Sequence, residues 1–137
     1  MNADIDKTKL EQRIAEAVAR LMSQRESAGG RVMLDVPVTY PSGASAVVEI
    51  GRNANKIWVS DMGMGLVEAE MMGAVDSYQR LARNKAEEFG VVYNSSAMFV
   101  LWAPADRIEG AIICVANASA QAAADAVRHA SEAQSKG

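Results

Sequence analysis

Residues 56–73, KIWVSDMGMGLVEAEMMG, decide how the chain is organised, because they pass from an extended segment through a glycine-containing corner into a helix. The letters IWVS are typical of a strand, and LVEAEMM favours a helix. Asp61 stands at the junction, where its carboxylate can accept hydrogen bonds from the free backbone amides of residues 63 to 65. The stretch therefore predicts a strand, a corner held by an aspartate and two glycines, and a helix.

Alternating hydrophobic residues before the corner predict a β-meander over residues 31–61. Turns are expected at PSGA and at GRNANK, which separate RVMLDVPVTY, SAVVEI and IWVS. A three-residue loop at 42–44 pairs Val36 with Ile50 and keeps the apolar side chains on one face. Pro37 cannot donate a hydrogen bond to a neighbouring strand, so it indicates a bulge or a sheet edge.

Helical periodicity and stop signals define the rest of the chain. Asp76 and Gln79 form a capping box that opens a helix. In the last segment AIICVA, at 111–116, has the composition of a strand, but small and apolar residues recur there at three- and four-residue steps and favour a helix. The expected elements of this single domain, 1–137, are an N-terminal helix within 1–30 whose periodic part is 6–27, the meander at 31–61, two helices at 64–89, a hairpin at 91–103 and a C-terminal helix at 106–132.

These elements predict an α+β fold. Its antiparallel β-sheet of about five strands is expected to pack against the N-terminal helix, the two central helices and the long C-terminal helix. Small residues dominate that last helix and permit another element to approach it closely, with alanine or serine at 116, 118, 119, 120, 122, 123, 124 and 126. Such a face either packs inside the molecule or forms the seam of a homodimer, and both arrangements stay open.

The composition is that of an ordinary globular domain and excludes several classes of function. Hydrophobic residues make up 50% and charged residues 23% of the 137 residues, so extensive disorder is not expected. The formal net charge is −3 without a basic patch, so we expect no nucleic acid partner. The chain has one cysteine, no secretion signal at its start and no apolar stretch near the roughly 18 residues of a membrane helix. We therefore expect a soluble cytoplasmic protein without a membrane role.

Three acidic residues on successive expected strands, Asp35, Glu49 and Asp61, form the candidate catalytic set. In the expected register Asp35 and Glu49 lie diagonally adjacent on the face away from the core, within reach of one divalent cation. Metal-dependent nucleases usually place a lysine two residues beyond the second acid, and here that position is Gly51. Strand parity puts Asp61 on the opposite face. We therefore expect solvated carboxylates with no metal and no cofactor, and keep a metal-dependent hydrolase or nuclease as the alternative.

Methionines gather around the corner, since four of the eight in the chain lie between residues 62 and 72. Flexible thioethers suit adaptable contact surfaces, although they also fill gaps between a helix and a sheet. The two glycines could offer backbone amides to an anion, but Glu68 and Glu70 would repel it. The candidate binding residues are therefore Met62, Gly63, Met64, Gly65, Met71 and Met72.

The segment Val59-Ser60-Asp61-Met62-Gly63 resembles a motif of small uncharacterised bacterial and phage domains. In those domains a strand ends in Leu-Thr-Asp-x-Gly, follows a β-hairpin and precedes short helices. The likeness covers residues 31–103, with serine in place of threonine, and it implies an α+β domain in a bacterial or prophage setting. The function of the family is not established, so the resemblance implies no activity and transfers no catalytic residue.

These observations favour a non-enzymatic accessory or regulatory protein that acts through protein–protein interaction. The expected contact surface is the methionine-rich segment 62–72 with the adjoining sheet edge. One form of such a protein is a phage- or prophage-encoded inhibitor of a host system. The alternative is the hydrolase built on the acidic residues of the sheet.

Overall fold

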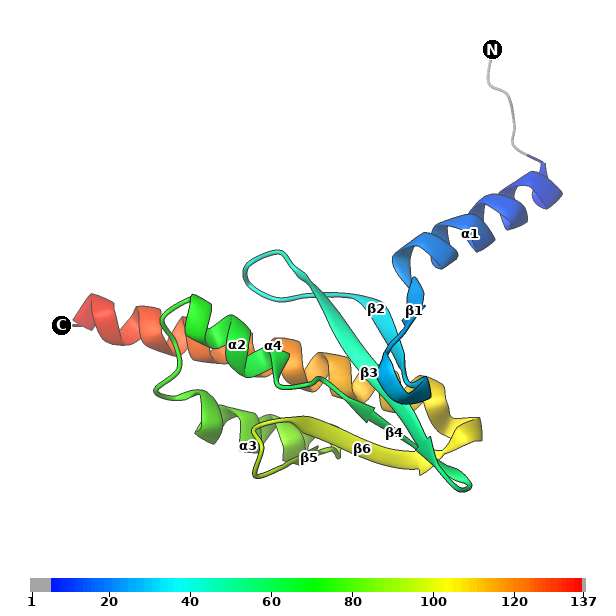
Figure 1. The fold of residues 1–137 in the computed structure, drawn as a ribbon. Helices are drawn as coiled ribbons and strands as arrows, with labels where there is room; N and C mark the ends of the chain where they lie inside the picture. Colours follow the sequence, from blue (N-terminus) through cyan, green and yellow to red (C-terminus); the bar gives the residue numbers. More distant parts are fainter. Residues whose placement is uncertain (1–5, 137) are drawn as a thin grey trace, which may run out of the picture.

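The structure of the chain is a computed structural model that describes residues 6–136. It has the predicted α+β fold, with a six-stranded antiparallel sheet in the order β1-β2-β3-β4-β6-β5 (Figure 1). The elements are α1 (Lys7–Leu21), β1 (Gln24–Glu26), β2 (Val32–Thr39), β3 (Ser45–Asn53), β4 (Lys56–Ser60), α2 (Met64–Met71), α3 (Tyr78–Phe89), β5 (Val92–Tyr93), β6 (Phe99–Pro104) and α4 (Ile108–Lys136), with single 3-10 turns at Ala28–Gly30 and Ala105–Arg107. The first five residues of the predicted N-terminal element, and residue 137, lie outside the described residues.

The β-meander forms where the alternating pattern predicts it, but its register is shifted. Val36 lies opposite Ala46 rather than Ile50. The pairing is irregular between Val36 and Thr39, the segment that holds Pro37, so the predicted bulge is present and contributes to the shift. Because the displacement is an even number of residues, the core-facing side chains keep their predicted face.

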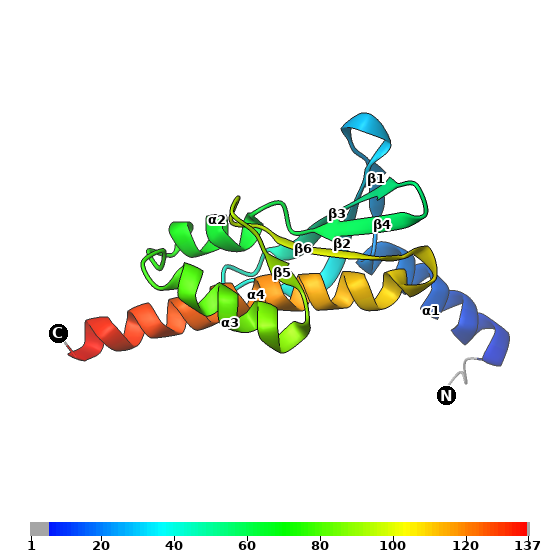
Figure 2. The ribbon, with the colours of Figure 1, turned by 90° about the horizontal axis from the view of Figure 1, so that it is seen from below.

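The N-terminal segment departs from the prediction, because the helix ends at Leu21 and a short strand follows it. β1 consists of three exposed residues, QRE, and is fixed by pairing with β2, where Arg25 lies opposite Met33. α1 buries none of its residues and leads away from the sheet (Figures 1 and 2). This helix therefore does not pack on the sheet as predicted.

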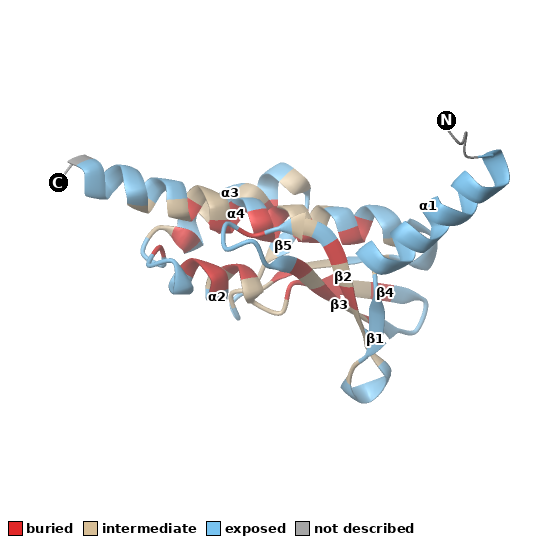
Figure 3. Cartoon of the chain, turned by 90° about the horizontal axis from the view of Figure 1, so that it is seen from above, coloured by how far each residue is buried: buried red, intermediate tan, exposed pale blue. Residues whose placement is uncertain are grey.

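α4 lies at the centre of the core and covers one face of the sheet, with α2 and α3 packed beside it (Figure 3). Its small residues permit this close approach, and Ala116, Ser119, Ala122 and Ala123 are fully buried. The alanine-rich face therefore packs inside the molecule. The predicted C-terminal helix is confirmed, and the alternative of a strand at 111–116 is wrong.

α4 also contains an 18-residue stretch that is apolar enough to cross a membrane, contrary to the prediction that no segment approaches this length. Alanine is the commonest residue in this helix. In this fold 56% of the stretch is buried within the molecule, as in the core helix of a globular domain. One such helix is weak support for a membrane role.

α3 begins slightly later than the capping box predicts. Ser77, not Asp76, is the N-cap residue, and its side chain makes no capping hydrogen bond. The Ser77 hydroxyl instead lies 3.0 Å from Nδ1 of His129, the one histidine of the chain. This contact joins the start of α3 to α4.

Enlarging a buried small residue of α4 should disrupt the core. Ala122 is 0% exposed, so Ala122→Leu is expected to lower the free energy of unfolding by about 1–3 kcal/mol through overpacking. Gln121→Leu, on the exposed side of the same helix, is the matched control and should change it by less than about 0.5 kcal/mol. Chemical denaturation measures both, and equal effects would contradict this packing of α4.

Candidate functional site

The corner after β4 is held by the carboxylate of Asp61, which is 0% exposed. Its Oδ1 accepts the backbone N–H of Gly63 at 2.9 Å and that of Phe99 at 2.9 Å. Its Oδ2 accepts the N–H of Gly65 at 3.2 Å and the hydroxyl of Ser119 at 2.7 Å. The predicted bonds to the corner amides are confirmed, and two donors from distant elements are added.

Four donors occupy both oxygens of Asp61, which gives the carboxylate a structural role. A buried charge is tolerated when hydrogen bonds replace its hydration in this way. The hydroxyl of Tyr40 extends the network, 2.8 Å from Oγ of Ser119. Burial raises the pKa of Tyr40 well above its ordinary value, so the phenol stays a neutral hydrogen-bonding group. The amides of the two glycines point at Asp61, which leaves them occupied rather than free for a phosphate.

The start of α2 requires glycine at position 65 because Tyr78 approaches it closely. A Cβ on Gly65 would lie 2.2 Å from the Tyr78 hydroxyl oxygen and 2.8 Å from Oγ of Ser119. Tyr78 is fully buried, and its hydroxyl has no hydrogen-bond partner among residues 6–136. Burial, followed by the nearby charge of Asp61, raises the pKa of Tyr78 well above its ordinary value. Gly65 therefore serves close packing in the core.

Asp35 lies on the sheet face away from α4, where residues of the segment after α1 hydrogen-bond to it. Its carboxylate accepts the hydroxyl of Ser23 at 2.5 Å and the guanidinium of Arg25 at 3.2 Å. The Ser23 hydroxyl, assisted by Arg25, holds the pKa of Asp35 below its ordinary value against the opposing effect of partial burial. The carboxylate of Asp35 thus holds β1 and the residue before it against β2.

Glu49 lies on the same face and is also paired. It accepts the hydroxyl of Ser27 at 3.1 Å, and its carboxylate lies 3.7 Å from the guanidinium of Arg31. Asp35 and Glu49 are diagonally adjacent as predicted, whereas Asp61 points into the core. Within the described part of the chain, no group of three His, Cys, Asp or Glu side chains is arranged to hold a metal ion.

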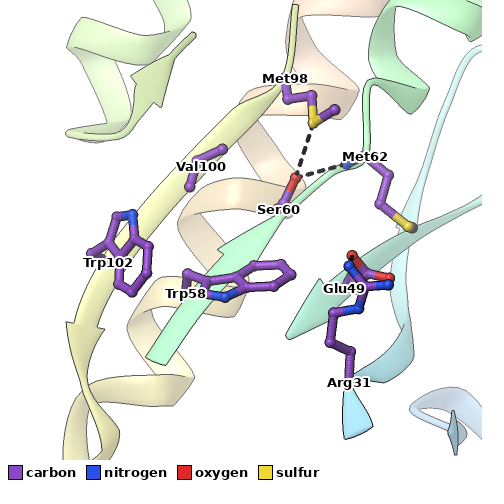
Figure 4. A pocket seen from close by; sticks show the side chains of 8 residues that line it. All are labelled: Arg31, Glu49, Trp58, Ser60, Met62, Met98, Val100 and Trp102. Carbon is purple, nitrogen blue, oxygen red and sulfur yellow. Dashed lines mark hydrogen bonds and ion pairs between the residues drawn. The ribbon is translucent and has the colours of Figure 1, made fainter. Parts of the chain in front are cut away.

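The uncovered face of the sheet carries both tryptophans of the chain. Trp58 on β4 lies directly opposite Trp102 on β6, and they surround a hollow of about 310 Å³ together with Val100 and the side chains of Met62 and Met98 (Figure 4). We call these five residues the tryptophan face. Its rim is completed by Arg31, Glu49 and Ser60.

The ring of Trp58 lies across Gly51, its neighbour on β3. A Cβ at this glycine would lie 2.3 Å from the ring. An aromatic side chain that covers a glycine in this way shields the backbone and fixes its own orientation. Trp102, in contrast, is 51% exposed. The tryptophan face therefore combines one held ring with one that is available for contact.

The Asp61 corner also sets the edge of the tryptophan face. Met62 has a left-handed backbone with φ of 58°, and its N–H donates to Oγ of Ser60 at 3.0 Å. The Ser60 hydroxyl lies 3.8 Å from the sulfur of Met98. The turn that directs the carboxylate of Asp61 into the core thus directs the thioether of Met62 to the opposite side of the sheet (Figure 4).

The structure divides the six predicted binding residues among three places. Met62 alone belongs to the tryptophan face. Met64 is half-buried against the core, whereas Met71 and Met72, at the end of α2, are 66% and 45% exposed. Gly63 and Gly65 donate their amides to Asp61. The predicted methionine cluster is therefore not one surface.

Sequence reasoning missed the two tryptophans, although strand parity could have found them. Trp58 alternates with the buried Ile57 and Val59, which places it on the side away from the core. Trp102 follows the same rule on β6. What the sequence did not reveal is that β4 and β6 are neighbours, so that the two rings share one surface.

No protein-family model, no curated protein and no solved structure matches the chain. The segment that resembles the Leu-Thr-Asp-x-Gly motif runs here from β4 into α2, with the aspartate at the buried corner. Membership of that family stays a prediction.

Replacing Asp61 with asparagine should destabilise the protein without any response to metal. Asp61→Asn keeps the shape but turns an N–H₂ group toward two donors, so the free energy of unfolding should fall by about 3 kcal/mol. Asp76→Asn, at an exposed position, is the control and should fall within about 0.5 kcal/mol of wild type. Thermal unfolding with magnesium, manganese or EDTA provides the second readout. A metal-dependent rise in the wild-type midpoint that the variant loses would make Asp61 a ligand.

A methyl group at position 65 should also destabilise the protein. Gly65→Ala places its Cβ against Tyr78, and relief requires movement of a fully buried ring. We expect a loss of about 1–3 kcal/mol. Combining Gly65→Ala with Tyr78→Phe removes the clashing oxygen and should recover part of the loss. A double variant no more stable than Gly65→Ala alone would refute this account.

Proposed function

We propose that this chain is a non-enzymatic binding module whose tryptophan face takes an apolar segment of a protein partner. The observation that carries the proposal is the asymmetry of the sheet, since α4 covers one face while the other bears both tryptophans around a hollow. Exposed apolar patches of this kind on a small domain mark interaction sites, and tryptophan is enriched where binding energy concentrates. A cytoplasmic accessory role remains part of the proposal.

The charges around the tryptophan face favour a protein over a nucleic acid. Aromatic side chains on an open sheet also stack bases, so electrostatics decides between the two classes. Arg31 and Glu49, the two charged residues that line the hollow, are paired with each other. A net charge of −3 adds repulsion toward phosphates. An apolar, charge-compensated surface suits an apolar side chain.

The hydrolase alternative has no comparable support. Its three acids are not brought together, because Asp61 is directed into the core with both oxygens occupied. Asp35 and Glu49 hold the N-terminal strand and turn in place. Their contacts explain these carboxylates without a reaction.

Peptides selected on the wild-type protein from a displayed random library test the proposal. We expect apolar peptides that quench or shift tryptophan emission and whose dissociation constant rises at least tenfold in Trp102→Ala, about 1.4 kcal/mol. Ile113→Ala is the matched control, because Ile113 is 55% exposed on α4, away from the tryptophan face. The selected peptides should bind Ile113→Ala with the same dissociation constant as wild type.

Two results would overturn the proposal. The first is a set of selected peptides whose affinity is unchanged in Trp102→Ala. The second is binding of single-stranded oligonucleotides that depends on Trp102, because the tryptophan face would then recognise bases. Circular dichroism of both variants verifies that the fold is intact.

A further inference from the structure

α1 is an amphipathic helix with nothing packed against its apolar side. A 15-residue helix is marginal in water and normally gains its stability from burial of its apolar face. Here that face is bare, as the uniform exposure of α1 shows (Figure 3). The large apolar side chains of this face are each between 44% and 57% exposed. They are Leu10, Ile14, Val18 and Leu21. The same molecule therefore presents an uncovered helix and an uncovered sheet face.

α1 is held away from the tryptophan face of its own chain. Met22, the residue that follows the helix, packs against the core. The carbonyl of Ser23 accepts the N–H of Asp35 at 2.9 Å, and β1 begins at the next residue. Because Met22 and Ser23 are both held in place, the connection is too short for α1 to turn back over the sheet of its own chain. α1 points outward in both views (Figures 1 and 2).

We propose that α1 of a second copy packs across the tryptophan face, and that two copies exchange their N-terminal helices reciprocally. This inference rests on the proposed function, because it names a partner for the same surface. A twofold exchange is closed, so it yields a dimer and not a chain of subunits.

The dimensions of the two surfaces agree. A helix of 15 residues is about 22 Å long at about 1.5 Å per residue. The sheet from β2 to β6 comprises three strand intervals, about 14 Å at about 4.8 Å each. α1 laid across the strands therefore reaches from β2 to Trp102 and beyond, over the whole width of the hollow.

Charge favours the body of another copy over a second α1. α1 has a net charge of +2, since it holds two lysines and two arginines against two glutamates. The whole chain carries −3, so the remainder carries −5. Pairing two α1 helices would bring like charges together, whereas the charged residues that line the hollow, Arg31 and Glu49, form an ion pair and add no net positive charge.

Reciprocity also supplies the area that a dimer needs. A single short helix on a sheet buries less than the roughly 800 Å² per partner of a typical stable complex. In an exchange each copy contributes α1 and also receives α1, so the buried area doubles. In the dimer, Trp102 of each copy, half-exposed in the single chain, would be covered by α1 of the other copy.

Sedimentation velocity across a range of micromolar concentrations, with tryptophan emission of the same samples, tests the exchange. Both tryptophans of the chain lie on the tryptophan face, so they report its cover directly. We expect a concentration-dependent dimer whose emission shifts to shorter wavelength as it forms. Ile14→Lys should be monomeric with long-wavelength emission, and Trp102→Ala should weaken the dimer at least tenfold. Ile113→Lys, an equally exposed site on α4, should dimerise as wild type does.

Three outcomes would overturn the inference. A wild-type chain that is monomeric throughout, with constant emission, has no exchange. A dimer broken by Ile14→Lys but untouched by Trp102→Ala is a pair of α1 helices. A dimer broken by Ile113→Lys is joined through the exposed side of α4. Circular dichroism of each variant separates loss of dimer from loss of fold.

The monomeric Ile14→Lys variant separates this inference from the proposed function. If exchange occurs, library-selected peptides should bind this variant at least as tightly as wild type, because no helix competes with them. Binding of peptides to a wild-type chain that never dimerises would refute the exchange alone. Failure of peptides to bind the monomeric variant would refute the proposed function.

Discussion

The carboxylate of Asp61 is the constraint on which the rest of the structure depends. It takes donors from its own corner, from β6 and from α4, so these parts are correctly placed only when they are placed together. Because water cannot hydrogen-bond to a buried carboxylate, the loss of any one of these donors lowers the free energy of unfolding. The same turn sends Met62 to the other side of the sheet. Core and exposed face are thereby set by one junction.

The fold could be predicted where its signals are local. The meander, the two central helices and the C-terminal helix follow from periodicity, and side-chain faces survived a shifted register because parity was preserved. β1 could not be predicted, since QRE has no alternation and is a strand only through its partner β2. The amphipathic pattern of α1 correctly indicated a helix but not that its apolar side would stay bare.

The candidate site, like the fold, could be predicted where its contacts are local in the sequence and not where they join distant segments. Bonds from Asp61 to residues two and four positions ahead were predictable, whereas Phe99 and Ser119 lie 38 and 58 residues away. The tryptophan face depends on β4 and β6 being adjacent, although α2, α3 and β5 separate them in the chain. A pattern within one strand carries no information about such a neighbour. The methionine cluster misled for the converse reason, because closeness in sequence did not place those side chains on one surface.

The position of Ser119 has a consequence for how the protein is made. A ribosome delivers the chain from its N-terminus, so Asp61 emerges long before the serine hydroxyl that completes its shell. Until α4 has left the exit tunnel, the meander has neither its covering helix nor a settled corner, and its apolar face is open to other chains. Folding of this domain therefore waits until α4 has been synthesised and released, and until then the nascent sheet is the species that a chaperone would have to protect.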